Sequence, residues 1–482
     1  MRRSRGCFVL GTMLEKGAEI ELDIQAGAEK GRGVARVDGF VVFVRQAIPG
    51  DRVLARVVKS RKNYAEAVLL KVLAPSPQRV EPRCRYFGAC GGCNWQHFSY
   101  DAQLEMKHRW VVDAFRHIGG FSSIDVKPAF GSSDIYFYRN KMEFSFSDRR
   151  WLTTQEIASG EKLEKEFALG LHVGDRYDKV LDIRECWLQS ELSNRILNAV
   201  RLWAVENGVP VYRADREGGY LRFLVIRQSR ATGEVLVNLV TFDDRSEVAQ
   251  SLSDFLEKKV GGITTFVNTV NRRKAQIAYG EEQRVHSGQG TITELLGGLT
   301  FRVSANSFFQ TNTVQAERMC LTVQEFAGLK SDDIVYDLYS GTGALALFIS
   351  PAVARVVGIE VVSRSVEDAR WNATANGVDN CVFVEGDVKE TLIDDGSVRE
   401  KLGDPSVIIL DPPRSGLHPK LAQALARTGP DRIVYVSCNP PTQARDIKIL
   451  SEGGYSVDVL QPLDMFPHTD HVECIARLTR RH

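Results

Sequence analysis

A cysteine and a glutamate late in the sequence are the residues best suited to chemistry. Cys438 follows a short apolar run at 434–437 and precedes a turn of one asparagine and two prolines at 439–441. Glu473 lies 35 residues further on, in a similar setting at the edge of a strand-like run. A thiol paired with a distant carboxylate suits covalent catalysis with proton abstraction. A lone cysteine is more often a small buried hydrophobe, but the rigid turn and the acidic residues upstream favour a nucleophile.

A glycine-rich turn upstream is suited to a nucleotide-type cofactor. Gly341 and Gly343 belong to the run 337–343, which ends a strand-like segment and opens a helical one, so the backbone can approach a ligand. Glu360 ends the next strand-like run, where a carboxylate can bind ribose hydroxyls, and Asp387 ends the third. An isolated Gly-x-Gly is often only a tight turn, but three such strand ends in order predict a cofactor crevice. The short glycine motif favours S-adenosylmethionine over NAD.

The fourth strand-like run ends in another acidic turn. Asp411 begins an Asp-Pro-Pro-Arg sequence that holds a carboxylate towards the same crevice, with Arg414 available for a phosphate or a base. A purely structural turn would use the two prolines equally well. The run 439–442 is similar to the Asn-Pro-Pro-aromatic motif of amino-methyltransferases, but it follows the fifth strand and Thr442 is not aromatic. An amine substrate is therefore not indicated.

Three cysteines lie close together in the first quarter of the sequence, at Cys84, Cys90 and Cys93. A fourth ligand must come from elsewhere, and Cys186 lies in the most suggestive context. Four thiolates suit either a structural zinc ion or an iron–sulfur cluster. Zinc sites more often use two matched pairs, so three close cysteines and a remote fourth favour a [4Fe-4S] cluster.

Strands and helices alternate in the C-terminal third, which predicts a doubly wound α/β sheet with ligands at the carboxyl ends of its strands. The expected strands lie at 334–338, 356–360, 381–384, 407–410 and 433–436. Except for Glu473, the candidate residues in this third follow or end one of these strands. The sheet would therefore gather them at one edge.

The rest of the chain has a different character. Short strand-like runs at 19–24, 39–44 and 52–58, with Arg and Lys interleaved, predict a small barrel of the oligonucleotide-binding type. Residues 74–78 are typical of a linker. Beyond it, a mixed region has strand-like runs at 223–227 and 234–240 and a helical run at 246–258.

Length and composition set further limits. A chain of 482 residues is too long for one core, so two or three domains are expected. No apolar run is long enough to span a bilayer, and the apolar part of residues 1–10 is too short for a signal peptide, so we expect a cytoplasmic protein. Nine cysteines in such a chain indicate metal binding or catalysis. Residues 1–75 carry 14 Lys and Arg against 8 Asp and Glu, which fits phosphate contact or a merely solvated basic face.

Together these motifs resemble the RNA 5-methyluridine methyltransferases, which use S-adenosylmethionine and carry an N-terminal TRAM domain and a four-iron cluster. The resemblance covers nearly the whole chain and includes the runs 31–50, 138–144 and 308–312. It implies a TRAM barrel of OB type at 1–75, a central α+β domain with the iron–sulfur cluster at 76–310, and a Rossmann-like methyltransferase domain at 311–482. Cys84, Cys90, Cys93 and Cys186 match the cluster ligands of the family.

The resemblance also implies roles in catalysis. Gln310, Tyr339, Glu360, Asp387 and Asp411 match residues that line the cofactor site, Cys438 matches the nucleophile and Glu473 the base. In that chemistry the thiolate adds to C6 of uracil, C5 takes the methyl group, the base removes the C5 proton and the thiolate leaves. The target uridine must be flipped from its stack or lie in a loop. Ser340 and Ala344 depart from the usual family residues, and the charged segment 147–166 resembles an insertion without an assigned function.

Two candidate substrates and one non-catalytic alternative follow. A TRAM domain with a cluster favours 23S ribosomal RNA, whereas archaeal enzymes of similar architecture act on the T-loop of tRNA. A non-catalytic iron–sulfur protein that binds RNA would leave Cys438, Glu473 and Asp411 without a purpose. We expect a monomer that binds RNA and no membrane.

Overall fold

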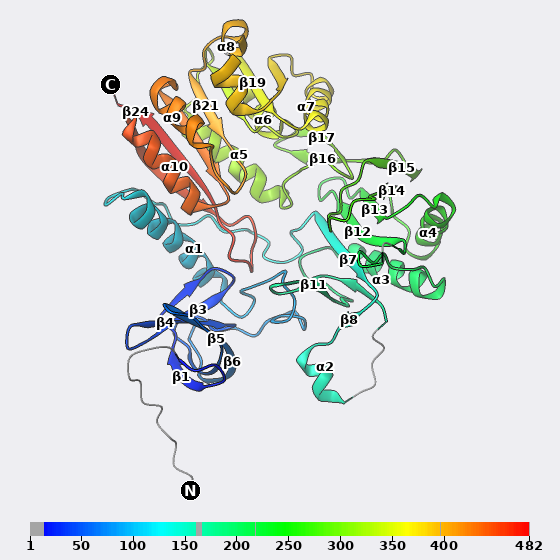
Figure 1. The fold of residues 1–482 in the computed structure, drawn as a ribbon. Coiled ribbons are helices and arrows are strands. Elements are labelled where there is room, and N and C mark those ends of the chain that lie inside the picture. The colour runs from blue at the N-terminus through cyan, green and yellow to red at the C-terminus, as the bar shows by residue number, and fades with distance from the viewer. Residues whose placement is uncertain (1–13, 161–165, 217, 396, 482) are drawn as a thin grey trace. The chain divides into compact units, whose positions relative to one another are not determined.

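The computed structural model describes residues 14–160, 166–216, 218–395 and 397–481, which form two compact units (Figure 1). The first unit contains the chain up to residue 88 together with 92–106 and 468–470, and the second contains the remainder. Residues 1–10, on which the signal-peptide argument depends, lie outside the described residues. No helix in the described part of the chain has the length and apolarity needed to cross a bilayer. The domain boundaries at 75 and 310 stay predictions.

The first unit is built around one six-stranded sheet. Its strands are β1 (Glu19–Asp23), β2 (Ala26–Ala28), β3 (Arg32–Val37), β4 (Phe40–Arg45), β5 (Arg52–Ser60) and β6 (Tyr64–Ala74), in the order β1-β5-β6-β4-β3-β2. Alternate residues of β4 and β5, among them Val42, Val44, Val53 and Ala55, are buried in a common core, as expected for a sheet with one solvated face. The described ladders begin at β1 and end at β2, so they form a half-barrel and do not close into the barrel expected from the sequence.

Two local features shape this unit. Asp38 and Gly39 have φ values of 47° and 84° and join β3 to β4 as a two-residue hairpin turn, the conformation that suits the twist of paired strands. The buried Asp51 carboxylate accepts hydrogen bonds from the backbone of Ile48 and Ser76 at 2.9 and 3.0 Å and pairs with Arg79 at 2.5 Å. Ser76 is itself buried, so the expected linker 74–78 is held to the sheet at this residue, while its other residues are exposed.

The central part of the second unit contains another six-stranded sheet. Its strands, in the order β15-β14-β13-β12-β7-β9, are β15 (Glu282–Ser287), β14 (Thr265–Val270), β13 (Val235–Thr241), β12 (Leu221–Gln228), β7 (Lys141–Ser147) and β9 (Ala168–Gly170). The helices α3 (Glu191–Glu206) and α4 (Ser246–Lys259) pack against each other beside it (Figure 1). Most residues of β12, β13 and β14 are buried, which explains their continuous apolar character.

Smaller elements complete this part. A three-stranded sheet joins β8 (Arg150–Trp151), β10 (His172–Val173) and β11 (Arg176–Leu181), and a hairpin joins β16 (Thr291–Leu296) to β17 (Leu299–Ser304). The segment 147–166 contributes β8 and the short helix α2 (Thr154–Ser159). Thr153 caps α2 in a reciprocal capping box with Glu156, a signal the sequence reading overlooked. Residues 161–165 of this segment lie outside the described residues.

A seven-stranded sheet forms the C-terminal part of the second unit. Its strands, in the order β20-β19-β18-β21-β22-β24-β23, are β20 (Cys381–Glu385), β19 (Arg355–Glu360), β18 (Ile334–Leu338), β21 (Val407–Leu410), β22 (Arg432–Ser437), β24 (Glu473–Arg480) and β23 (Tyr455–Leu463). The first five are parallel, and β24 is antiparallel to both of its neighbours. Strand order reverses between β18 and β21, the place where open α/β sheets bind ligands. The predicted strands of this third agree with the structure to within a residue at either end.

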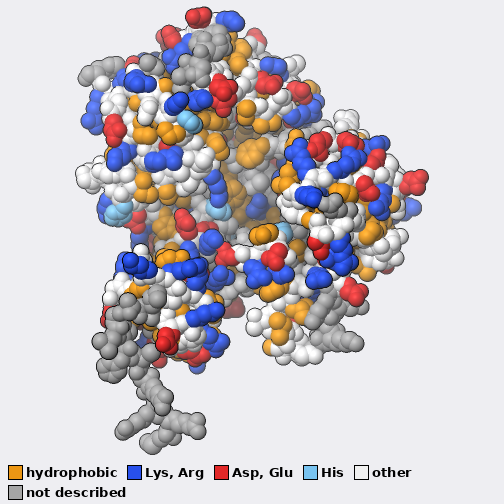
Figure 2. Space-filling view, in the orientation of Figure 1, with side chains coloured by type: hydrophobic (Ala, Val, Ile, Leu, Met, Phe, Trp, Pro, Cys, Tyr) orange, Lys and Arg blue, Asp and Glu red, His pale blue; other side chains and the backbone are white. Residues whose placement is uncertain are grey.

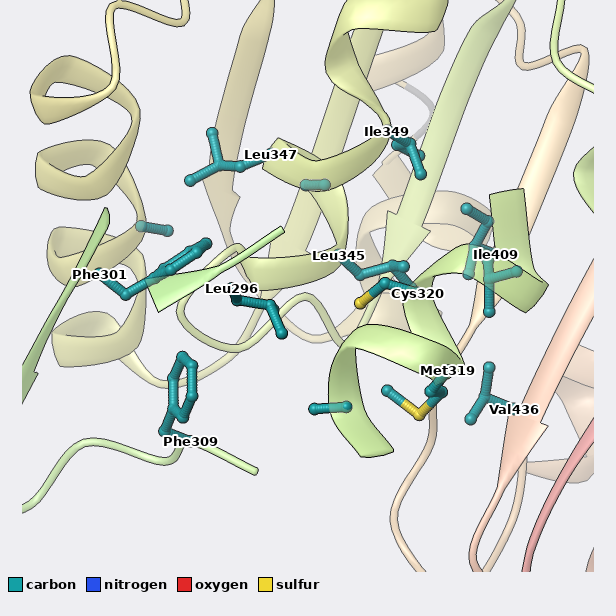
Figure 3. Close-up of a cluster of buried hydrophobic side chains, with 14 of the residues drawn as sticks. Leu296, Phe301, Phe309, Met319, Cys320, Leu345, Leu347, Ile349, Ile409 and Val436 are labelled. Carbon is teal, nitrogen blue, oxygen red and sulfur yellow. The ribbon is translucent and has the colours of Figure 1, made fainter. Parts of the chain in front are cut away.

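Helices cover both faces of this sheet. On one face lie α5 (Thr313–Ala327), α6 (Ala344–Ile349) and α7 (Ser363–Ala375), and on the other lie α8 (Ser397–Leu402), α9 (Pro419–Thr428), α10 (Pro440–Glu452), the π-helical turn Phe115–Gly119 and the end of α1 (Tyr100–Ala114). Figure 3 shows the first core, in which Met319 and Cys320 of α5 lie near Leu345, Ile409 and Val436. This core also contains Leu236 and Val267 of the central sheet. The two sheets of the second unit therefore share one apolar interior.

Candidate active site at the carboxyl edge of the parallel strands

The candidate residues gather at the carboxyl ends of β18, β19, β20, β21 and β22. Tyr339, Gly341 and Gly343 follow β18, Glu360 ends β19, Asp387 follows β20, Asp411 follows β21 and Cys438 follows β22. Because these strands are parallel, their carboxyl ends lie at one edge of the sheet. The strand ends singled out in the sequence therefore lie along one edge, and the cofactor crevice stays a prediction.

The turn after β18 has an unusual backbone. Tyr339, Gly341 and Gly343 all have positive φ, of 70°, 54° and 78°. A tyrosine rarely adopts this conformation, and strain of this kind is concentrated at functional sites. A Cβ at position 343 would lie 2.8 Å from the Phe383 ring, so only glycine fits there. The Glu360 carboxylate accepts a hydrogen bond from Gly341 N at 3.0 Å and thereby holds the turn against β19.

Two carboxyl groups lie close together behind this turn, Asp337 buried and Asp411 half-buried. Burial raises the pKa of Asp337 and of Asp411 to about 7, and the nearby Asp411 adds to the shift at Asp337. Asp337 Oδ2 has no hydrogen-bond partner among the described residues. Asp387 is bonded differently, since its Oδ1 accepts from the backbone of Lys389 and Glu390 at 3.0 and 3.1 Å. This edge of the sheet therefore contains an acceptor oxygen without a hydrogen-bond partner among the described residues, Asp337 Oδ2. It also contains two carboxyl groups, Asp337 and Asp411, whose raised pKa values disfavour ionisation.

The buried Asp337 should destabilise the fold at high pH. An unfolded aspartate has a pKa of about 4, so the folded state holds extra protons between that value and about 7, and stability falls as pH rises through this window. Asp337→Asn should therefore raise the melting temperature of the ligand-free protein by a few degrees at about pH 8, with little difference at about pH 5. The matched exposed change Asp379→Asn should have no such effect. Equal melting curves for Asp337→Asn and wild type at both pH values would contradict this account.

The pairing of β22 with β24 brings the candidate nucleophile and base together. Ser437 pairs with Cys474 in this antiparallel ladder, so the next step places Cys438 opposite Glu473. Burial and then the Glu473 carboxylate raise the pKa of the Cys438 thiol, while Arg414 opposes them. Burial and the neighbouring Asp411 raise the pKa of Glu473 to about 8. The thiol and the carboxyl group are thus close enough to interact electrostatically, although they are 35 positions apart in the sequence.

Arg414 reaches this pair from the turn after β21. Its positive charge lowers the pKa of the Cys438 thiol, and its Nη2 lies 2.9 Å from His471 Nδ1. Its backbone carbonyl accepts hydrogen bonds from Asn439 Nδ2 at 2.9 Å and Thr442 Oγ1 at 3.3 Å. The Asp-Pro-Pro-Arg and Asn-Pro-Pro-Thr turns are therefore bonded to each other. Their prolines fix a cation beside the thiol, a contact that the sequence reading did not assign.

The chain leading to Glu473 is held by buried groups. Lys107 of α1 and Asp464 form an ion pair at 2.5 Å in which both side chains are fully buried. Lys107 also donates to Phe466 O at 3.3 Å, and Gln315 Nε2 of α5 donates to Asp464 O at 2.8 Å. A lysine is almost never fully buried unless it is paired. Because the partners are 357 positions apart, no local pattern could have indicated this anchor.

The remaining predicted site residues lie elsewhere. Gln310 precedes α5, and its carbonyl accepts a hydrogen bond from Asn140 Nδ2 at 2.9 Å. Cys84 and Cys93 belong to the first unit, where Gln96 accepts from Cys84 N at 3.0 Å and donates to Cys93 Sγ at 3.3 Å.

Cys90 and Cys186 belong to the second unit. Cys90 pairs with Val173, and Cys186 N donates to Asn194 Oδ1 at 2.9 Å. In the described ranges, no group of three or more His, Cys, Asp or Glu is arranged to hold a metal ion. The cluster ligands therefore stay a prediction.

A doubly wound sheet with acidic residues at its strand ends and helices on both faces is an α/β architecture that binds ligands at the strand ends. Residues 229–481 match the family model described as tRNA (uracil-5-)-methyltransferase, and residues 14–70 match the TRAM domain. The chain belongs to this methyltransferase family and carries an N-terminal TRAM domain. The α/β methyltransferase fold and the TRAM domain expected from the sequence are thereby confirmed.

Individual relatives are similar over nearly their whole lengths. An uncharacterised RNA methyltransferase of Chlorobaculum tepidum is 44% identical, with 96% of this chain and 97% of the relative covered. Another, of Bacteroides thetaiotaomicron, is 40% identical, with 94% and 100% covered. Among solved structures, the tRNA (uracil-54, C5)-methyltransferase of Pyrococcus abyssi in complex with S-adenosyl-L-homocysteine is 30% identical, with a TM-score of 0.73 and 95% and 100% of the two chains covered.

Proposed function

We propose that this protein transfers a methyl group from S-adenosylmethionine to C5 of a uridine in structured RNA. The observation that carries the proposal is the ladder of β22 and β24, which sets Cys438 against Glu473 at the carboxyl edge of the sheet. Membership of the family supports the reaction type. The S-adenosyl-L-homocysteine bound to the related Pyrococcus abyssi enzyme supports the choice of donor.

The crevice fits such a donor. Gly341 leaves open space at the turn, and Glu360 offers carboxylate oxygens at the end of β19. The buried Asp337 Oδ2 and Ser340 Oγ have no hydrogen-bond partners among the described residues. Tyr339, Gln310 and Asp387 would complete the lining. S-adenosylmethionine bound there supplies an electrophilic methyl group.

The residues of the chain would act in sequence on the uracil. Arg414 lowers the pKa of Cys438 against the effect of burial, which favours the thiolate that adds to C6. The electron density gained by C5 makes that carbon the nucleophile for methylation. Glu473, in its ionised form, then removes the C5 proton, the C5–C6 double bond returns and the Cys438 thiolate leaves. Asp411, half-buried next to Glu473, would orient the ring.

The choice of RNA remains part of the proposal. We favour a loop uridine of 23S ribosomal RNA because the family resemblance pairs a TRAM domain with a cysteine cluster. A tRNA T-loop uridine is the second candidate, supported by the similarity to the tRNA (uracil-54, C5)-methyltransferase. Mapping 5-methyluridine in ribosomal RNA and tRNA from cells with and without the gene would decide between them. If ribosomal RNA and tRNA both keep all of their 5-methyluridine in cells without the gene, the proposed function is contradicted.

We propose that the TRAM domain binds RNA through the solvated face of its sheet. Arg32 lies over the Phe43 ring at 4.7 Å, and Phe43 meets Tyr64 edge to face at 5.7 Å. Arg36 is exposed on the same face of β3. Figure 2 shows Lys and Arg side chains on the exposed surface of this unit. Aromatic rings beside guanidinium groups are the usual platform for single-stranded RNA.

Removing two of these charges should weaken RNA binding. In Arg32→Gln/Arg36→Gln we expect the slope of log affinity against log salt to fall by about 1.4, or about 0.7 for each lost phosphate contact. The matched control is Arg52→Gln/Arg56→Gln, because those charges are already paired with Glu21 and Glu19 at 2.9 and 2.8 Å. Fluorescence titrations at several salt concentrations measure both. Equal slopes for the two double variants would contradict this RNA surface.

We also propose that Cys84, Cys90, Cys93 and Cys186 hold a [4Fe-4S] cluster, on the strength of their spacing and the family resemblance. Protein purified without oxygen should then contain about four iron and four sulfide ions and absorb broadly in the visible range. Cys93→Ser should lose most of the iron, whereas Cys381→Ser should keep it. Zinc in place of iron in the wild-type protein would overturn the cluster in favour of a structural zinc site.

A further inference from the structure

Two cations oppose each other at one end of the central sheet. Lys141, the first residue of β7, pairs directly with Arg227 of β12 in the antiparallel ladder. Arg139 lies just before them, and its Nε donates to Lys141 O at 3.3 Å. Like charges directly opposite in a ladder are destabilising. The sheet therefore contains a repulsive pair, Lys141 and Arg227, and the packing of the strands does not require two cations at these positions.

The nearby negative charge is too small to offset it. Glu143 Oε2 lies 3.8 Å from Lys141 Nζ, beyond hydrogen-bond distance, and the Glu143 side chain is 43% exposed. Within the described ranges, no ion pair joins Arg139 or Arg227 to a carboxylate. Arg227 is almost fully buried, donates to Ser307 O and to Ala305 O at 3.5 Å, and has no partner for its Nε.

The charge of Arg227 also acts on the protonation of Lys141. Burial and then the charge of Arg227 lower the pKa of Lys141 to about 8, with a smaller effect from Arg139, while Glu143 opposes them. The lysine side chain nevertheless keeps 30% of its surface exposed. A ligand can therefore reach its ammonium group, and an anion bound there would relieve the repulsion.

Contacts link the segment that carries Arg139 and Lys141 to two segments of the proposed active site. Asn140, between Arg139 and Lys141, donates to Gln310 O and to Thr313 Oγ1, each at 2.9 Å. The Arg139 guanidinium lies 5.9 Å from the centre of the Phe466 ring, in the chain that leads to Glu473. A group held by these cations would thus be close to the segment proposed to line the donor site.

We propose that Arg139, Lys141 and Arg227 form a binding site for a phosphate of the RNA strand that carries the target uridine. Arg139 and Lys141, which are half-buried, contact the phosphate oxygens, and the buried Arg227 strengthens the local positive potential. A fixed phosphate near the crevice would set the position of the neighbouring base. This inference rests on the proposed function, because it takes RNA as the substrate.

The site has a pH signature with a definite sign. A bound phosphate raises the pKa of Lys141 above its free value of about 8. The contribution of Lys141 to binding is then complete below about pH 8 and is lost as pH rises through the pKa of the complex. RNA binding at about pH 8 should therefore take up a fraction of a proton.

The test uses the full chain and a fluorescent single-stranded oligouridylate. Lys141→Met should weaken binding about 10-fold and reduce the salt slope by about 0.7. Lys141→Arg should keep the affinity but lose the proton uptake and the weakening above about pH 8, because arginine stays charged. Lys258→Met, an exposed change in α4, should match the wild-type protein throughout. Calorimetry in buffers of different ionisation enthalpy measures the uptake.

Two results would overturn the site. One is a Lys141→Met protein with wild-type affinity and salt slope, and the other is a Lys141→Arg protein that takes up as many protons as wild type. Because Lys141→Met removes the repulsion with Arg227, this variant should melt no lower than the wild-type protein, and that measurement separates loss of the site from misfolding. Failure of the proposed function is distinct, since the wild-type protein would then neither bind nor methylate RNA.

Discussion

Cys438→Ala is expected to reduce methyl transfer to RNA to the background level and to abolish every covalent protein–RNA adduct. The thiol lies one step beyond the Ser437–Cys474 pair of the β22–β24 ladder, opposite Glu473, and is a group that can add to C6 of uracil. Without this addition C5 is too weak a nucleophile, so the loss should be at least about 10⁴-fold, the scale seen when a catalytic nucleophile is removed. Transfer of labelled methyl groups to RNA measures turnover, and a denaturing gel measures the adduct.

The matched control is Cys381→Ala in β20, a half-buried cysteine of the same sheet. This variant should keep both turnover and adduct formation. Cys438→Ala should also keep its affinity for S-adenosylmethionine, because the thiol is not among the groups proposed to hold the donor. A Cys438→Ala protein that methylates uridine at the wild-type rate would remove the nucleophile from the proposal.

Glu473→Gln is expected to trap the reaction at a later point. The amide cannot remove the C5 proton, so RNA that is already methylated should remain bonded to Cys438. Turnover should fall by about 10² to 10⁴, the usual contribution of a positioned base, while a labelled adduct accumulates to about one per protein chain. The adduct should contain the transferred methyl group, which distinguishes it from a simple addition product.

The same change should alter the thiol. Burial and the Glu473 carboxylate both raise the pKa of Cys438, so removing the negative charge should lower that pKa and make the thiol alkylate faster at about pH 8. Glu452→Gln at the exposed end of α10 should change neither property. Loss of turnover without any methylated adduct would mean that Glu473 is needed before methyl transfer and is not the C5 base.

In the wild-type protein, Glu473 must be ionised to act. Since burial and Asp411 raise its pKa to about 8, proton removal should speed up as pH rises towards that value and then level off. The structure thus assigns the base a titration close to physiological pH.

Much of the C-terminal framework could be predicted because its signals are local. Apolar runs that end in Gly, Glu or Asp gave β18 to β21 nearly to the residue, since a buried parallel strand has a continuous apolar sequence. The crevice followed, because parallel strands end at one edge. The pairing of Cys438 with Glu473 could not be derived in this way, as β24 enters the sheet between β22 and β23, out of sequence order.

Long-range partners account for what the sequence missed. Lys107 and Asp464 are ordinary charged residues in their local contexts, and only the fold buries them together. Lys141 and Arg227 likewise become neighbours only through the β7–β12 register. The sequence predicted a closed barrel for the first unit, whereas the described strands form a half-barrel. Closure depends on which edge strands pair, and the sequence of each strand does not show this.

The acidic crevice has a consequence for the enzyme after each turnover. Asp337, Asp411 and Glu473 crowd three carboxyl groups into a region of low polarity, and such a region attracts positive charge. The sulfonium of a fresh donor is cationic, whereas the thioether left after transfer is neutral. Exchange of spent for fresh donor should therefore be favoured by electrostatics, and inhibition by the spent form should strengthen in acid, where the carboxyl groups take up protons.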